Sequence, residues 1–274
     1  MDKPITSITP PSRFSFGLKE LWQYRELFYF FTWRDIKVKY KQTSLGILWA
    51  ILQPLAMMLL FTFLFSRNLD IDTGSVSYQI FVLAGLICWN LFNSAVSHAG
   101  ESMIQNANII TKIYFPRLII PCSSTLAALF DFIIGLIIFI VFCVLYKQPI
   151  SWAAIVYFPA AILLILLISI GAGTFLAALN IKYRDFRYTI PFLLQVLFFA
   201  SQIIYPVHLI KSEILRYVLS INPINAVLEL FRAPLYGVSP DMNVVSIGVI
   251  VTLFIFFIGL FYFKKTEAYF ADIA

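Results

Sequence analysis

The stretch from Gln148 to Ile181 reads QPISWAAIVYFPAAILLILLISIGAGTFLAALNI and contains no Lys, Arg, Asp or Glu. A helix crosses the hydrocarbon core of a bilayer with about 20 apolar residues, each rising about 1.5 Å. This stretch is long enough to do so. It therefore predicts a membrane-spanning helix.

Five further intervals along the chain are equally free of charge. Four of them are long enough to span as they stand: 42–66, 73–100, 188–210 and 242–263. The fifth, 132–146, becomes a span only if its helix begins near Cys122, which places Asp131 inside or at the edge of the membrane. With 61% hydrophobic and 12% charged residues and a mean hydropathy of +0.87, the chain is predicted to be an all-α polytopic membrane protein with six transmembrane helices.

The Lys and Arg residues between these intervals fall mainly on alternate loops. Because basic residues in short loops resist translocation, the richer side is predicted to face the cytoplasm. That side holds both termini and carries Lys3, Arg13, Lys19, Arg25, Arg34, Lys37, Lys39, Lys41, Lys112, Arg117, Lys182, Arg184, Arg187, Lys264 and Lys265, whereas the other side carries Arg67, Lys147, Lys211, Arg216 and Arg232. The net charge of +6 then reflects membrane topology rather than a nucleic-acid interface.

The chain is predicted to form one transmembrane domain over 1–274. Its parts are a cytoplasmic tail and interface helix over 1–41, a six-span bundle over 42–263 and a second cytoplasmic tail over 264–274. No cleavable signal peptide is recognisable, because the first apolar run starts only near Leu45. The first span is therefore expected to act as its own insertion signal.

The segment before the first span mixes aromatic and charged residues. Its apolar positions, from Phe14 to Trp33, recur mostly at spacings of three or four and are interleaved with charges such as Lys19 and Arg25. This pattern predicts an amphipathic helix in the membrane interface, with its aromatic face in the lipid. It is either a plain membrane anchor or a helix that frames a docking site for a cytoplasmic partner.

Two of the inner loops have patterned sequences. In 101–117, apolar residues share one helical stripe, while Asn106 and Asn108 offer uncharged hydrogen bonds away from it, and Pro116 ends the element. The second loop, 180–188, packs charges of both signs among aromatic residues. We expect two compact cytoplasmic elements, either solvated loops or two contact points for one partner.

The longest outer segment, 206–241, predicts a re-entrant or interfacial hairpin between spans five and six. Two apolar stretches within it are each too short to span: 214–221 and 226–236. Asn222 followed by Pro223 has the chemistry of a helix start, and Glu229 and Arg232 are spaced to pair on that helix. Such a hairpin would cover the outer end of a transport pathway through the membrane.

The residues that ATP or metal chemistry requires are missing from the sequence pattern. No G-x-x-x-x-G-K-[ST] phosphate loop occurs, and His98 and His208 lie at predicted opposite faces, too far apart for a zinc site. Asp70 and Asp72 resemble the paired carboxylates of some glycosyltransferases but stand in an outer loop, where nucleotide sugars are absent. The three cysteines are odd in number, have no ligand spacing and are predicted to be apolar packing residues: Cys88, Cys122 and Cys143.

Asp131 is the ionisable residue that this topology places within a span. Intramembrane acids are functional candidates by default. The alternative is that Asp131 lies close enough to water or to a neighbouring helix to be satisfied structurally. The sequence is compatible with both interpretations.

Aromatic residues make up 17% of the chain, more than interfacial belts alone require. Most are expected to face lipid. Aromatic rings also stack on sugar rings, so a pathway lined by them would suit a carbohydrate cargo.

Four motifs occur in order along the chain. They are Arg34–Trp49 followed by Pro54, Asn106–Arg117 with Pro121, Tyr183–Asp185, and Asn222–Pro223 ending at Arg232. Together they resemble type-2 ABC exporter permeases for surface polysaccharides, a family that includes permeases for O-antigen, capsular polysaccharide and teichoic acid. The resemblance covers about Leu18 to Phe263.

The resemblance implies a homodimer that encloses a channel, with two copies of a separate P-loop ATPase docked beneath it. ATP and Mg would be bound by that partner, so no cofactor and no catalytic residue is expected in this chain. The cargo would be a lipid-linked glycan, O-antigen in the first instance and teichoic acid or capsular polysaccharide next. Export would cross the bacterial cytoplasmic (inner) membrane.

The resemblance also implies roles for particular residues. The expected ATPase-coupling positions are Asn106, Asn108, Lys112, Arg184 and Asp185; those of the interface helix are Trp22, Arg25 and Arg34; those of the outer gate are Asn222, Pro223 and Arg232.

Two rival functions are a self-sufficient secondary carrier or channel and a membrane-embedded enzyme of lipid-linked glycans. The first predicts inverted repeats, and no convincing repeat is present. The second needs a cluster of acids, bases or metal ligands at one membrane face, which Asp131 alone does not supply.

Overall fold

The computed structural model describes residues 18–41, 46–67, 71–183, 185–210 and 212–267, and its regular elements are all helices. Four long helices form the bundle: α4 (Tyr78–Gln105), α6 (Ile119–Leu145), α7 (Ala154–Lys182) and α11 (Met242–Thr266). A fifth, α3 (Leu48–Phe61), continues through a π-helical turn, η1 (Thr62–Arg67). These five are long and apolar enough to cross a membrane, which confirms five of the predicted spans as helices.

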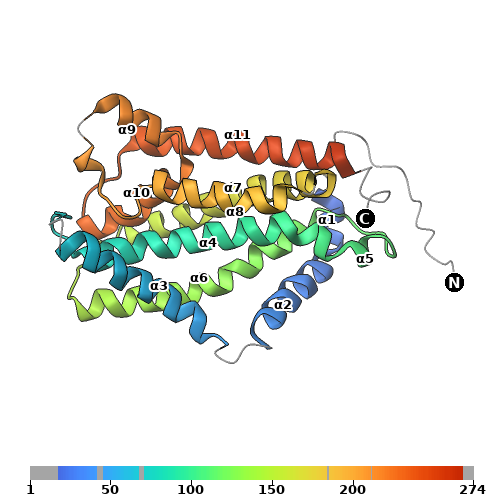
Figure 1. Ribbon diagram of the computed structural model, residues 1–274, viewed down its shortest axis with the longest axis horizontal. Coiled ribbons are helices and arrows are strands. Elements are labelled where there is room, and N and C mark those ends of the chain that lie inside the picture. Colours follow the sequence, from blue (N-terminus) through green and yellow to red (C-terminus); the bar gives the residue numbers. More distant parts are fainter. Residues whose placement is uncertain (1–17, 42–45, 68–70, 184, 211, 268–274) are drawn as a thin grey trace.

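Helix α4 lies at the centre of the bundle and packs against both α6 and α7 (Figure 1). Its apolar side chains Ile80, Leu83 and Leu91 are at most 1% exposed. Cys88 and Cys143 are buried in the same core, as expected of packing residues. Helix α11 packs against α7 and α10 (Pro223–Tyr236), and α2 (Arg25–Lys41) packs against α6.

The predicted fifth span, 188–210, is wrong in extent. Only α8 (Phe186–Ala200) is helical there, and its 15 residues rise by about 22 Å, short of the roughly 30 Å of a hydrocarbon core. The chain then leaves the helix at Ser201 and reaches a short 3-10 turn, η2 (Val207–Leu209). An uncharged sequence therefore contains a broken helix, not a uniform span.

The predicted outer hairpin forms two helices, α9 (Glu213–Ser220) and α10 (Pro223–Tyr236), which meet at an angle of 95°. The Asn222 side chain accepts from the Ile224 N–H at 3.1 Å, and Pro223 occupies the first turn, so the predicted helix start is confirmed. Helix α10 ends at Gly237, whose φ of 67° is left-handed. Most of α10 is buried against α4, α7 and α11, so its backbone is shielded by protein.

The two ends of the bundle differ in charge. Helices α1 (Leu18–Gln23) and α5 (Ala107–Ile110), the α7–α8 connection and the C-terminal end of α11 lie at one end, and α9 and α10 lie at the other (Figure 1). We call these the basic end and the hairpin end. Among the described residues, α2 (Arg25–Lys41) and the basic end carry Lys19, Arg25, Arg34, Lys37, Lys39, Lys41, Lys112, Arg117, Lys182, Arg187, Lys264 and Lys265, whereas the hairpin end carries Arg67, Lys147, Arg216 and Arg232.

Glycines allow α7 and α11 to approach closely. A Cβ atom added at Gly259 would lie 2.0 Å from the carbonyl oxygen of Gly171, and one added at Gly171 would lie 2.5 Å from Cα of Phe256. In a membrane, where lipid is as apolar as a leucine side chain, small residues bring helix backbones into contact. This contact fixes α11 against the core.

Candidate functional site

Helix α2 packs along the first half of α6. Phe31 is 1% exposed and its ring centroid lies 5.8 Å from that of Phe115, whereas Tyr29 and Trp33 are 70% and 45% exposed. The predicted amphipathic segment is therefore helical from Leu18 on, but it is divided at Tyr24 into α1 and α2, and residues 14–17 lie outside the described residues. Its aromatic residues, however, divide between the protein and the surroundings instead of forming a single outward face.

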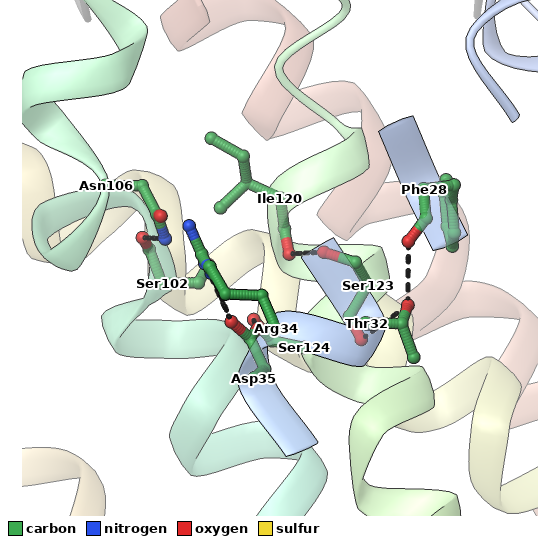
Figure 2. A network of polar contacts seen from close by, with 9 residues as sticks. All are labelled: Phe28, Thr32, Arg34, Asp35, Ser102, Asn106, Ile120, Ser123 and Ser124. Carbon is green, nitrogen blue, oxygen red and sulfur yellow. Dashed lines mark hydrogen bonds and ion pairs between the residues drawn. The ribbon is translucent and has the colours of Figure 1, made fainter. Parts of the chain in front are cut away.

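Polar contacts fix the register of α2 on α6 (Figure 2). The Thr32 hydroxyl donates to the Phe28 carbonyl of its own helix at 2.9 Å and also lies 3.4 Å from the Ser123 carbonyl oxygen of α6. The Ser124 hydroxyl donates to the Asp35 carboxylate at 3.0 Å, and Asp35 also pairs with Arg34 at 2.7 Å. In Figure 2 the Arg34 side chain extends from α2 toward Ser102 and Asn106, while the hydrogen bonds of Thr32 and Ser124 join α2 to α6.

Asp131 lies near the middle of α6 and is contacted by the last turn of α2. The Lys39 ammonium pairs with its carboxylate, and the Tyr40 hydroxyl donates a hydrogen bond to it. The Asp131 side chain is 21% exposed and that of Lys39 is 42% exposed. Asp131 thus has the protein partners that the structural interpretation requires, while a functional role for it stays a prediction.

The α4–α6 connection begins at Asn106, which is buried rather than exposed. Asn106 is 6% exposed, and its amide donates to the Ser102 carbonyl at 2.7 Å. The expectation that it offers a hydrogen bond away from the apolar stripe is wrong, because α4 stops at Gln105 and α5 begins at Ala107. Asn106 lies between the end of α4 and the start of α5, and coupling through it stays a prediction.

The tip of the same connection is exposed. Asn108 and Lys112 point outward as expected, and Ile113 and Tyr114 are 61% and 64% exposed beside them. The stripe pattern missed this last pair. Three apolar residues stand directly before Pro116, and the sequence does not indicate that the third, Phe115, is buried while the first two are exposed.

The α7–α8 connection forms the second exposed element. Asp185 and Arg187 are exposed, Tyr188 is 81% exposed and Tyr183 is 48% exposed. Arg184, the other predicted coupling residue here, lies outside the described residues. The connection therefore offers both charge and aromatic surface.

These two elements lie at the basic end, as does α1 (Figure 1). On α1, Trp22 is 72% exposed and the Arg25 guanidinium lies 5.8 Å from its ring centroid. We call the exposed set the docking face: Trp22, Asn108, Lys112, Ile113, Tyr114, Asp185, Arg187 and Tyr188. Exposed aromatic residues among charged ones are typical of protein interfaces.

At the hairpin end, Arg232 projects from α10 into the core. It is 7% exposed and donates to the carbonyl oxygens of Gln202 at 2.6 Å, Ile203 at 2.9 Å and Phe81 at 3.0 Å. Its guanidinium also lies 3.5 Å from the centroid of the Phe81 ring. Two of these carbonyls, those of Gln202 and Ile203, follow the end of α8 and have no helical partner, and Arg232 supplies their donors.

Two asparagines of the hairpin also bind the chain after α8. Asn222 donates to the Ser201 hydroxyl at 2.8 Å, and Asn225 accepts from the Gln202 N–H at 2.9 Å. With Arg232, they attach α10 to the residues where α8 ends. The predicted gate residues Asn222 and Arg232 are therefore brought together around one backbone segment.

The expected pairing of Glu229 with Arg232 is wrong. Glu229 accepts from the Asp241 N–H at 3.0 Å, next to the start of α11, while Arg232 turns toward α4. The spacing of three residues permits a pair, but the buried carbonyls compete for the guanidinium.

The described residues contain no group of three or more His, Cys, Asp or Glu side chains placed to hold a metal ion. His98 Nδ1 lies 2.8 Å from the Ser94 carbonyl oxygen on the same helix. Asp72 accepts from the Gly74 N–H at 2.7 Å in a turn, and Asp70 lies outside the described residues. Local contacts account for these side chains.

The chain matches the family model described as "ABC-2 type transporter" over residues 26–236, from α2 to the end of α10. It is 30% identical to the O-antigen export system permease protein RfbA of Myxococcus xanthus, over 80% of this chain and 84% of that protein. It is 26% identical to a protein of the same name from Klebsiella pneumoniae, over 88% and 92%. It is 28% identical to the polysialic acid transport protein KpsM of Escherichia coli, over 85% and 91%.

We expect Asp131→Ala to lower the free energy of unfolding by about 1–2 kcal/mol, because two hydrogen-bond donors lose their acceptor and Lys39 loses its ion-pair partner. Asp131→Asn should recover part of the loss, since an amide oxygen still accepts from Tyr40. Denaturant unfolding of the purified protein in detergent measures both. Glu101→Ala is the control, because Glu101 accepts from Gln105 at an exposed site; equal losses in the two alanine variants would contradict the expectation.

We expect Arg232→Met to cost about 2–4 kcal/mol, because it leaves three buried carbonyls without their charged donor. Arg232→Lys should be nearly as harmful, since one ammonium does not reproduce the planar fork. The same unfolding measurement applies, with Arg216→Met on exposed α9 as the matched control. Stability equal to that of the control would show that Arg232 does not hold α10 in place.

Proposed function

The chain belongs to the ABC-2 type transporter family, and we propose that it is the permease of an ATP-driven exporter of lipid-linked surface polysaccharide, with O-antigen the first candidate. As a member of this family it is a multi-pass membrane subunit of a transporter and not itself an enzyme. The observation that carries the proposal is the similarity to polysaccharide permeases over 80% to 88% of this chain. The family match, over residues 26–236, includes the hairpin and all of the docking face except Trp22.

The proposed assembly contains two copies of this chain and two copies of a separate P-loop ATPase. The sequence has no phosphate loop of its own, so the energy would come from that partner. The docking face supports this arrangement, because its exposed aromatic and charged residues lie together at one end. Closure of the ATPase subunits would move α5 and the start of α8, and with them the spans.

The basic end would face the cytoplasm. Its excess of Lys and Arg over the hairpin end supports this orientation. The hairpin would then cover the outer mouth of the pathway in the bacterial cytoplasmic membrane, where α10 and Arg232 hold it against α4. Both termini would be cytoplasmic.

The identity of the exported glycan is the part of the proposal for which there are alternatives. The relatives from Myxococcus and Klebsiella are named for O-antigen export, and the Escherichia relative is named for polysialic acid transport. Capsular polysaccharide is therefore the second candidate, and teichoic acid follows by the resemblance of the motifs. Family membership argues against a secondary carrier or a glycan-modifying enzyme.

Deletion of the gene tests the function. We expect a lipid-linked glycan to accumulate on the cytoplasmic side and to disappear from the cell surface, and mass spectrometry of the extracted lipids identifies its sugars. Affinity purification of the tagged permease should recover a stoichiometric ATPase. Normal surface glycan in the deletion strain, or reproducible absence of an ATPase, contradicts the proposal.

Substitutions on the docking face test the coupling. We expect Tyr114→Ala and Asp185→Ala to reduce export at least tenfold, a loss of about 1.4 kcal/mol of coupling, because both side chains project from the basic end. Insertion and expression should be unchanged. Export is measured by complementation of the deletion strain, with Arg216→Ala at the hairpin end as the control; full export by both variants would place the ATPase elsewhere.

A further inference from the structure

Helix α4 carries a stripe of polar residues in the interval that the charge pattern marks as a span. Its members recur at spacings of three and four: Asn90, Asn93, Ser94, Ser97 and His98. All five are partly or fully exposed in the single subunit, although the rest of this helix is largely buried. A polar amide against hydrocarbon costs several kcal/mol, so the stripe has to face water, protein or a polar ligand.

The stripe lines two adjoining cavities. One of about 260 Å³ lies between α3, α4 and α6, with Gln53, Asn90, Asn93 and Ser97 in its wall. The other, of about 430 Å³, lies between α2, α4 and α6. Both have Lys39, Ser94 and His98 in their walls, so they lie next to each other, and we call the pair the polar cleft. The second cavity alone, at about 430 Å³, falls within the roughly 300–1,000 Å³ typical of ligand sites.

Several polar groups in the cleft are unpaired. Within the described part of the chain, the side chains of Gln53, Asn90, Asn93 and Ser97 make no hydrogen bond to protein. Each amide offers both a donor and an acceptor, and the hydroxyl offers the same. Unpaired groups that line a cavity call for water or a ligand with the same mixed capacity.

The charges of the cleft cancel in pairs. Arg34 is bound to Asp35 at 2.7 Å, and Lys39 is bound to Asp131. A site for a phosphate or another anion would keep its cations free. Neutral groups that both donate and accept match the hydroxyls of sugars, and the Tyr40 ring in the wall adds an aromatic face.

We propose that the polar cleft binds neutral sugar residues of the exported glycan within a single subunit. The inference rests on the proposed function, and it deepens that function by naming where the cargo meets this chain. The amides and hydroxyls of α4 exchange hydrogen bonds with sugar hydroxyls along the helix. The Lys39–Asp131 pair keeps this stretch of the cleft polar while its two charges balance each other.

Cysteine accessibility in the full permease–ATPase complex tests the proposal. Asn93→Cys and Ser97→Cys are made singly in a background in which Cys88, Cys122 and Cys143 are serine, and only variants that still export are used. Inverted membrane vesicles are treated with a membrane-impermeant methanethiosulfonate reagent. Ile133→Cys is the control, because Ile133 is 55% exposed on the apolar side of α6 close to Asp131.

We expect both cleft cysteines to be modified and the Ile133→Cys variant to resist. Without ATP, modification should slow several-fold in vesicles from a strain that makes the glycan, compared with vesicles from a strain that cannot make it. Equal rates in the two strains mean that the cleft holds water only, and a lack of modification in both means that another subunit covers it. Either result overturns the proposal.

The deletion strain separates this failure from a failure of the proposed function. If glycan accumulates there and the cleft cysteines gain no protection, the exporter assignment stands and only the cleft assignment falls. If no glycan accumulates, the proposed function itself fails.

Discussion

A polar group at bilayer depth needs a partner, because hydrocarbon offers none. This constraint explains why α8 can break where it does. The backbone carbonyls at Gln202 and Ile203 are satisfied by Arg232 from α10, and the Gln202 N–H is satisfied by Asn225. The buried cation is in turn held by dipoles and by the Phe81 ring rather than by a carboxylate. The hairpin and the broken helix therefore stabilise each other.

The sequence predicts the helices whose ends are marked by charged residues or proline. It does not predict the break after α8, where a distant part of the chain supplies the hydrogen-bond partners of the backbone. Helices α4, α6, α7 and α11 fall on predicted intervals, since a long uncharged run has few other stable forms in a membrane. Nothing in the sequence of the interval 188–210 indicates the break after Ala200. Hydropathy reports how apolar a segment is, and the break depends on Arg232, thirty residues further along.

The same limit applies to the candidate site. The resemblance of the motifs predicts coupling roles for Asn106, Asn108, Lys112 and Asp185. A motif does not distinguish a side chain that faces a partner protein from one that lies at the end of a helix. Asn106 lies at the end of a helix. The charge pattern does not reveal the polar stripe of α4, because amides and hydroxyls are neutral. Polar residues at helical spacing inside an uncharged interval are the sequence signal that marks it.

Helix α4 joins every part of the proposed mechanism. Its 28 residues form a rod of about 42 Å, with Asn106 and the docking face at one end and Phe81, bound by Arg232, at the other. The polar cleft lies along the rod between them. A rigid helix that is held at both ends transmits a displacement along its length, because its own hydrogen bonds resist bending. On the proposed function, movement of the ATPase at α5 therefore reaches the hairpin through the same helix that lines the cargo site, and coupling needs no separate relay.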